Sequence, residues 1–232
     1  MMEAILRQGL SELSLPTDNI PALLRYAELL AEKNKVMNLT AITDPAGVAR
    51  LHFLDCAALL TLVPFQGKRV VDVGTGAGFP GLPLRILEPS IDLTLLDAQR
   101  KRVDFLREVC RELDMEDVRC LHERAEDLAR DRREHFDLAV SRAVASLPVL
   151  AELCLPLVRV GGKFLAMKSV DTQEELNAAG RAVQILGGRL EKPLDYGISG
   201  TNIRHRLVII TKIEKTLKKY PRSFAKIKKN PL

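Results

Sequence analysis

A glycine-rich turn after a short apolar run is the segment of this chain best suited to bind a ligand. The β-branched run ends at Asp72-Val73, and glycines follow at Gly74, Gly76 and Gly78. This order predicts a buried strand, a tight turn and the start of a helix. Glycine has no Cβ, so the backbone of such a turn lies close against a ligand. A dinucleotide-binding turn places its third glycine one residue later, where this chain has Phe79, so the pattern favours a methyl donor.

Acidic residues follow the next two predicted strands, at the sheet edge where open α/β folds bind ligands. Asp97 comes directly after Leu95-Leu96 and lies 19 residues beyond Gly78. At that spacing a carboxylate accepts hydrogen bonds from both ribose hydroxyls of a nucleoside, or it caps the helix that starts near Arg100. The third strand ends in His122-Glu123-Arg124-Ala125-Glu126-Asp127. An acid just past this strand either meets an adenine amino group or caps a helix.

Two cations follow the fourth and fifth predicted strands. Arg142 lies in the sequence Ser141-Arg142-Ala143, and Lys168 ends the fifth strand. A cation beside a sulfonium donor requires a nearby anion, such as a phosphate or the carboxylate of the cofactor. Lys168 is either a second cation on the same rim or an ordinary strand-terminal lysine. The chain has no Asn-Pro-Pro-Tyr, Asp-Pro-Pro-Tyr or Pro-Cys sequence, which disfavours methylation of an exocyclic amino group and covalent attack on a pyrimidine.

Alternating strand and helix patterns predict the scaffold that positions these residues. Strands are expected at 69–73, 91–96, 118–121, 136–140 and 163–167, and helices at 82–87, 100–113, 147–158 and 172–186. Such alternation predicts a parallel sheet with helices on both faces. Residues 188–196 and 206–211 are predicted as strands with no helix between them, which gives a terminal antiparallel hairpin. The predicted fold is α/β, a Rossmann-like class I S-adenosylmethionine-dependent methyltransferase with a mostly parallel seven-stranded sheet.

The chain divides into three predicted parts, which are an N-terminal helical extension (1–64), a methyltransferase domain (65–212) and a basic C-terminal tail (213–232). Between Lys212 and Lys229 eight cations accompany a single acid, Glu214, whereas the rest of the chain is nearly neutral. A basic segment favours polyanions such as nucleic acid, and the alternative is a solvated tail that only aids solubility. Because the cofactor site is expected at the strand ends, it is predicted to be independent of this tail.

Composition excludes several other classes of protein. The chain has no tryptophan and only 4% aromatic residues, which disfavours a base-stacking platform for single-stranded nucleic acid. Its four cysteines have no C-x-x-C spacing, so we expect reduced thiols and no metal site. We find no signal peptide and no apolar stretch of the length of a membrane span, and we expect a cytoplasmic protein without a membrane partner.

Taken in order, these segments resemble the bacterial small-subunit ribosomal RNA methyltransferase family G, also called the glucose-inhibited division protein B family. The resemblance covers roughly residues 30 to 170. It rests on Asn38-Leu39-Thr40, His52-Phe53-Leu54-Asp55, Asp72 to Gly81, Leu95-Leu96-Asp97 with Lys101-Arg102, Arg124-Ala125-Glu126, Ser141-Arg142-Ala143 and Lys168. The Gly-Phe-Pro-Gly ending of the glycine turn and the Ser-Arg-Ala sequence are the most specific of these motifs.

The resemblance implies S-adenosylmethionine-dependent methylation of guanine N7 at position 527 of 16S rRNA, in the 530 loop. The implied cofactor-binding residues are Gly74, Phe79, Ala125, Glu126 and Arg142, to which the glycine turn and strand-end argument add Gly76, Gly78 and Asp97. The implied partner is 16S rRNA or the small ribosomal subunit, and we expect a monomer. The rival interpretations are a methyltransferase of another RNA or of a small molecule, a dehydrogenase, and an RNA-binding module without activity.

The implied reaction needs no catalytic acid or base, because guanine N7 carries a lone pair and no proton. Alignment of N7 with the methyl carbon and exclusion of water would be the main contributions of the protein. Arg124, Arg142 and Lys168 are the residues expected to face the RNA. Of these, Arg142 and Lys168 are the candidates for positioning the guanine.

Overall fold

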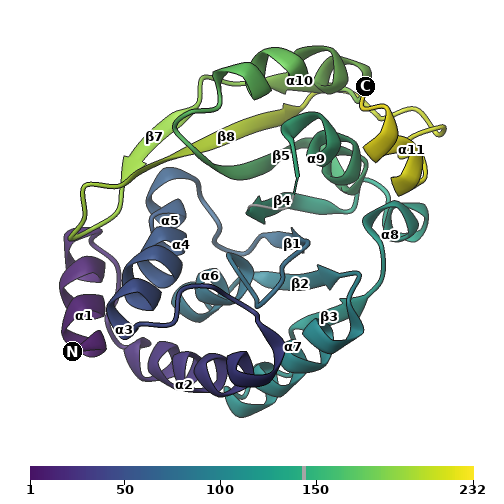
Figure 1. Cartoon of the computed structure of the whole chain (residues 1–232). Coiled ribbons are helices and arrows are strands. Elements are labelled where there is room, and N and C mark those ends of the chain that lie inside the picture. Colours follow the sequence, from purple (N-terminus) through teal and green to yellow (C-terminus); the bar gives the residue numbers. More distant parts are fainter. Residues whose placement is uncertain (143–144) are drawn as a thin grey trace.

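A mixed sheet of eight strands runs through the molecule in a computed structural model that describes residues 1–142 and 145–232 (Figure 1). The strand order is β3-β2-β1-β4-β5-β8-β6, and β7 pairs with β8 beside this path. The strands are β1 (Arg69–Val73), β2 (Asp92–Asp97), β3 (Arg119–His122), β4 (Phe136–Arg142), β5 (Val158–Ser169), β6 (Gly188–Leu190), β7 (Leu194–Gly197) and β8 (Arg204–Lys212). Strands β1 to β5 run parallel, and β8 is antiparallel to β5.

The register of the central strands brings the predicted site residues to one edge. Val73 of β1 pairs with Leu96 of β2, and Asp72 pairs with Val140 of β4. Because these strands are parallel and nearly flush, the turn after β1, Asp97 at the end of β2 and Arg142 at the end of β4 all leave the sheet on the same side.

The terminal part of the sheet differs from the sequence prediction in its strand count. The single strand expected at 188–196 is two short strands, β6 and β7, and both pair antiparallel with β8. The break contains Pro193, which has no N–H to donate to a ladder. The sheet therefore has eight described strands instead of seven, while the α/β class and the terminal antiparallel hairpin are confirmed.

Helices cover both faces of the sheet (Figure 1). Alternate side chains of each strand point to opposite faces, so Val70 joins one apolar core and Val71 the other. The first core is covered by α1 (Met2–Glu12), α2 (Ile20–Met37), the stretch from α3 (Pro45–Gly47) through a π-helix (Val48–Leu54) and α4 (Asp55–Ala57) to α5 (Leu59–Leu62), α6 (Gly81–Leu87) and α7 (Arg100–Glu112). The second is covered by α8 (Ala125–Asp131), α9 (Leu147–Cys154), α10 (Gln173–Ile185) and α11 (Phe224–Lys229).

No apolar segment of the length of a membrane span is expected from the sequence, and the helical stretch Pro45–Leu62 shows that this expectation is wrong. By length and composition alone this one stretch of the described chain is sufficient to cross a membrane, and 56% of it is buried inside the protein. Its apolar residues, such as Phe53 and Leu59, belong to the first core. A helix packed between a sheet and other helices is surrounded by apolar side chains, as a membrane helix is surrounded by lipid. Packing in the first core therefore accounts for the apolar composition of this stretch.

The C-terminal segment, residues 213–232, is packed against the domain. Tyr220 and Ile227 are buried in the second core. Arg222 donates to both carboxylate oxygens of the buried Glu152 at 2.7–3.2 Å. Arg133 donates to backbone carbonyls of the segment, including that of Tyr220 at 2.9 Å. These contacts anchor the basic segment to the domain.

Candidate active site

A cavity of about 500 Å³ opens at the edge where the parallel strands end. Its walls come from the turn after β1, the ends of β2 and β4, the segment before α8, the N-terminal helical region and the C-terminal segment. It is lined by Leu39, Thr40, His52, Val73 to Ala77, Phe79, Leu96 to Gln99, Arg102, Glu123 to Glu126, Arg142, Leu153 and Phe224. Ligands of open α/β sheets bind at this edge, and the volume is that of a small-molecule site.

The glycine turn forms the floor of the cavity, and its glycines have different roles. Gly74 and Gly76 have φ values of +71° and +62° and line the cavity, and a Cβ on Gly76 would meet nothing within 4 Å. Gly78 does not line it. A Cβ there would lie 2.5 Å from Leu82 and 2.6 Å from the hydroxyl of Tyr26. Gly78 therefore lets the turn pack against the helices, and the structure does not bring it to the predicted cofactor wall.

Asp72 shapes the turn from below. Its carboxylate accepts hydrogen bonds from the Thr75 hydroxyl at 2.7 Å and from the Gly81 N–H at 2.8 Å. Burial raises its pKa to about 7, although these two hydrogen bonds oppose the shift. The side chain is fully buried and does not line the cavity, so the acid in the glycine motif orders the backbone that a ligand would touch.

Asp97 joins the glycine turn to the residue that precedes α7. One carboxylate oxygen accepts from the Gly76 N–H at 3.0 Å, and the other accepts from the Gln99 N–H at 2.8 Å, just before α7. The guanidinium of Arg102 lies 3.6 Å away. Each carboxylate oxygen has a further lone pair, so the group can still accept two ligand hydroxyls from the cavity.

The segment before α8 and the C-terminal segment meet across the cavity. Ala125, Glu126 and Arg124 all line it, as the sequence predicts. Glu126 accepts a hydrogen bond from the Phe224 N–H at 3.1 Å, and the Arg124 guanidinium lies 5.6 Å from the centre of the Phe224 ring. Sequence reasoning did not assign Phe224 to the site, and the only local signal is an aromatic residue within a run of lysines. The tail therefore reaches the cavity in which the cofactor site is expected, which the sequence does not predict.

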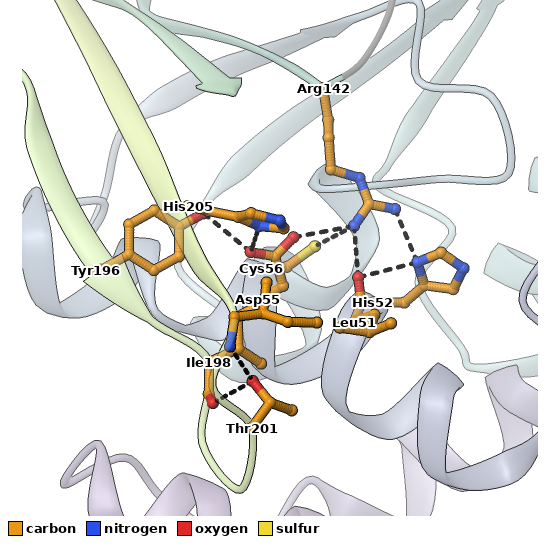
Figure 2. A network of polar contacts seen from close by, with 10 residues as sticks. Leu51, His52, Asp55, Cys56, Arg142, Tyr196, Ile198, Thr201 and His205 are labelled. Carbon is orange, nitrogen blue, oxygen red and sulfur yellow. Dashed lines mark hydrogen bonds and ion pairs between the residues drawn. The ribbon is translucent and has the colours of Figure 1, made fainter. Parts of the chain in front are cut away.

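Arg142 is held by groups of the protein itself (Figure 2). Its Nη1 donates to the Leu51 carbonyl at 3.1 Å and to Asp55 at 3.3 Å. Its Nη2 lies 3.1 Å from Nδ1 of His52, and that nitrogen is also 3.1 Å from the Leu51 carbonyl oxygen. The guanidinium also lies 4.8 Å from the centre of the Phe79 ring. The anion that a cation at this position requires is thus Asp55, which is only 1% exposed.

Asp55 ties this arrangement to the terminal hairpin (Figure 2). It accepts hydrogen bonds from the Tyr196 hydroxyl at 2.9 Å and from Nδ1 of His205 at 2.8 Å. The hydrogen bond to Asp55 raises the pKa of His205 above its usual value, against the effect of burial. One buried carboxylate therefore joins the N-terminal helices, β4, β7 and β8 beside the cavity.

His52 was noted in the sequence only as part of a motif, and the structure places it in the cavity wall. Its ring stacks on Phe79 with centroids 4.5 Å apart, and its Nε2 lies 2.8 Å from the Thr40 hydroxyl oxygen. Burial and the neighbouring Arg142 lower its pKa to about 4, so the imidazole is neutral at neutral pH. The motif residues His52 and Asp55 thus contact Arg142, and Thr40 contacts His52, which their spacing in the sequence does not reveal.

Lys168 does not share the cavity with Arg142. Its ammonium donates to the Ala145 carbonyl and pairs with Glu175, both at 2.7 Å. The reason lies in the register, because Arg142 pairs with Met167, the neighbour of Lys168. Successive side chains of a strand point to opposite faces, so a rim shared by the two cations is not observed. Ala143 of the Ser-Arg-Ala motif lies outside the described residues.

The fold is shared with solved structures at low sequence identity. TrmN from Thermus thermophilus aligns with a TM-score of 0.53 and 23% identity, over 69% of this chain and 48% of that chain. YcgJ from Bacillus subtilis aligns with a TM-score of 0.55 and 15% identity, over 70% of this chain and 100% of that chain. These similarities establish the Rossmann-like fold of class I methyltransferases.

Sequence comparisons cover nearly the whole chain. A ribosomal RNA small subunit methyltransferase G from Clostridium botulinum (strain ATCC 19397 / Type A) is 46% identical over 213 residues, which are 90% of this chain and 89% of the relative. The protein of that name from Clostridium tetani is 44% identical over 214 residues, or 91% and 90% of the two chains. The family model described as rRNA small subunit methyltransferase G matches residues 19–219. The chain therefore belongs to the rRNA small subunit methyltransferase G family.

Proposed function

We propose that this protein transfers a methyl group from S-adenosylmethionine to N7 of guanine 527 in the 530 loop of 16S rRNA. The observation that carries the proposal is the cavity in which the glycine turn, Asp97 and the balanced Arg142 meet, in a chain of this family. The relatives are named for the RNA of the small ribosomal subunit. We expect the protein to act as a cytoplasmic monomer on 16S rRNA or on the small ribosomal subunit.

The residues of the cavity suit S-adenosylmethionine. The open space above Gly76 admits a ligand directly against the backbone. Asp97 offers acceptors for two ribose hydroxyls, and Glu126 offers one for an adenine amino group. When bound, S-adenosylmethionine supplies an electrophilic methyl group. The charge of Arg142 is already balanced by Asp55, so it does not stand as a lone cation in a cavity proposed to hold a sulfonium group.

Guanine N7 suits the side chains that line the cavity. N7 has a lone pair and no proton, so the enzyme needs to align it and to exclude water, without removing a proton. His52, the natural candidate for a base, is held between Arg142 and Thr40 and stays neutral. In this arrangement Arg142 positions the base by orienting the side chains of the cavity wall. Arg124 faces the RNA, and Lys168 supports the backbone at Ala145.

Labelled methyl transfer tests the proposal directly. Small ribosomal subunits and naked 16S rRNA, both lacking the modification, would be incubated with the protein and methyl-tritiated S-adenosylmethionine. Borohydride reduction followed by aniline cleaves RNA at 7-methylguanosine and maps the position. Gly76→Val, which places a branched side chain in the cavity at a positive φ, serves as the inactive control once its folding is verified.

Incorporation of one methyl group with cleavage at position 527 supports the proposal, and the two RNA arms show which substrate form is used. Label at another atom of the guanine, in another RNA, or only in small molecules would overturn it.

A further inference from the structure

Two of the four cysteines lie side by side where α7 packs on β3. Cys110 is in the last turn of α7, and Cys120 is in β3, the edge strand of the sheet. Their Sγ atoms are 3.8 Å apart and share a hydrogen bond. Cys110 is 4% exposed and Cys120 is 9% exposed. Neither residue lines the cavity at the strand ends, so this thiol pair is separate from the candidate active site.

Neighbouring groups make the two thiols unequal. Arg107 donates from Nη2 to the Cys120 carbonyl at 3.1 Å, which places its guanidinium beside Cys120. The hydrogen bond with Cys110 lowers the pKa of the Cys120 thiol below its usual value, burial opposes this shift, and the charge of Arg107 adds to it. The same hydrogen bond, burial and the charge of Asp117 raise the pKa of the Cys110 thiol. Cys120 therefore loses its proton first, and the Cys110 thiol donates to the resulting thiolate.

This difference matches the two members of a reactive thiol pair, which are an attacking thiolate and a resolving thiol. The thiolate is the form of cysteine that attacks an oxidant, so Cys120 is the attacking group. The oxidised sulfur then needs a second thiol within reach, and Cys110 is already in contact with it. The other two cysteines, Cys56 and Cys154, are fully buried, and burial raises the pKa of both thiols.

We propose that Cys110 and Cys120 form an oxidation-sensitive site that reacts with hydroperoxides such as hydrogen peroxide and closes to a reversible disulfide. The Cys120 thiolate attacks one oxygen of the peroxide and the O–O bond breaks. Cys120 becomes a sulfenic acid, and the second oxygen leaves as hydroxide, which takes up the proton lost from Cys120. The Cys110 sulfur then attacks the Cys120 sulfur, the S–O bond breaks, and water leaves with the proton of Cys110. Two thiols lose two electrons, and one peroxide is reduced to two molecules of water.

The second step protects the edge of the sheet from irreversible damage. A sulfenic acid without a partner thiol is oxidised further to a sulfinic acid, which thiol reductants do not reverse. Cys120 is the only buried residue of β3, so a charged sulfinate there would be placed under α7 without a partner for its charge. A disulfide is uncharged, and exchange with a small dithiol returns it to two thiols.

Peptide mapping of the parent protein tests the site without any variant. Reduced protein would be treated with a small molar excess of hydrogen peroxide and then with catalase. Remaining thiols would be alkylated in denaturant before digestion with trypsin, which cleaves after arginine. The expected disulfide joins the peptide Glu108–Arg111 to the peptide Cys120–Arg124, and dithiothreitol should restore both thiols. Alkylation of both thiols after peroxide treatment, or a disulfide that involves Cys56 or Cys154, would overturn the proposal.

Serine variants separate the two roles once thermal unfolding has shown that they are folded. Cys110→Ser removes the resolving thiol, so peroxide should convert Cys120 to a sulfenic acid that dimedone traps, and then to a sulfinic acid. Cys120→Ser should slow the reaction of the remaining thiol of the pair by roughly tenfold, because Cys110 keeps its proton. Cys154→Ala is the matched control, since it removes a buried thiol of α9 and should form the disulfide as the parent does. An equal yield of sulfinic acid in the parent and in Cys110→Ser would contradict the resolving role of Cys110.

Discussion

The orientation and charge balance of Arg142 are set by the residues that contact it. Its guanidinium is fixed by Leu51, Asp55 and His52 and lies over the ring of Phe79. A cation held in this way is preorganised, because no free energy is needed to orient it when a substrate arrives. Asp55 balances its charge, so an incoming phosphate is not required for that purpose.

Asp97 carries a prediction about cofactor binding. Asp97→Ala removes an acceptor proposed for the ribose, and the loss of a hydrogen bond to a charged group costs on the order of 1.5–3 kcal/mol. S-adenosylmethionine should therefore bind roughly tenfold to a hundredfold more weakly by calorimetry. Asp92→Ala, at the half-buried start of the same strand and outside the cavity lining, is the control. A change below twofold in a folded Asp97 variant would restrict Asp97 to its contacts with Gly76 and Gln99.

His205 carries a prediction about the pH dependence of stability. Its hydrogen bond to Asp55 raises its pKa in the folded state, so the protonated form stabilises the fold. This contribution is complete below the unfolded pKa of about 6.5 and is lost as the pH rises through the folded value. His205→Gln should therefore lower the free energy of unfolding by about 1 kcal/mol at pH 6 and by less at pH 9. Denaturant titrations at both pH values measure this difference, and a loss that grows with pH would contradict it.

At the scale of elements, the C-terminal segment contributes to the cavity although it follows the last strand. Glu152 and Glu126, on helices α9 and α8, receive Arg222 and the backbone N–H of Phe224. The start of α11 is thereby held at the cavity, with the Phe224 side chain in its wall. The segment connects a basic surface to the site where the cofactor is proposed to bind.

Phe224→Ala tests this connection. Removal of the ring opens one wall of the cavity, and the lost apolar contact of about 1 kcal/mol corresponds to roughly fivefold weaker binding of S-adenosylmethionine. Phe224→Leu should retain most of the affinity, because it keeps an apolar wall. Calorimetry on both variants provides the measurement, after thermal unfolding has shown that α11 still packs. Equal affinity of parent and Phe224→Ala would mean that the cofactor does not reach this wall.

At the scale of the whole molecule, positive charge is concentrated in the C-terminal segment, but not all of it is available to RNA. Lys212, which ends β8 just before this segment, is fully buried and donates to the Leu155 carbonyl. Arg222 within the segment is paired with Glu152. The exposed cations of this segment are Lys215, Lys218, Lys219, Lys226, Lys228 and Lys229. Six exposed lysines, rather than the eight cations counted in the sequence, form the surface on which RNA contacts are expected.

The double variant Lys218→Gln with Lys219→Gln should weaken RNA binding at low salt. Each phosphate contact that is lost reduces the log–log salt slope by about 0.7 to 0.9, because fewer counterions are released. The matched control replaces two exposed lysines elsewhere, Lys35→Gln with Lys192→Gln, and should leave the slope nearer that of the parent. Filter binding at several salt concentrations measures the slopes. Identical slopes for parent and the Lys218 and Lys219 variant would exclude this part of the segment from the RNA interface.

The sequence by itself determined the class of the fold and the glycine turn with Asp97 after it. Those features depend on local patterns, namely alternating apolar residues, glycines that adopt positive φ, and an acid at a strand end. Only the tertiary structure decided how Arg142 is used, because its partners His52 and Asp55 lie about 90 residues away in the chain. The same holds for Phe224, which reaches the cavity through long-range packing, and for Lys168, which strand register turns away from Arg142. Side-chain direction and contacts between distant segments arise only when the sheet and its helices assemble, so local sequence patterns do not contain them.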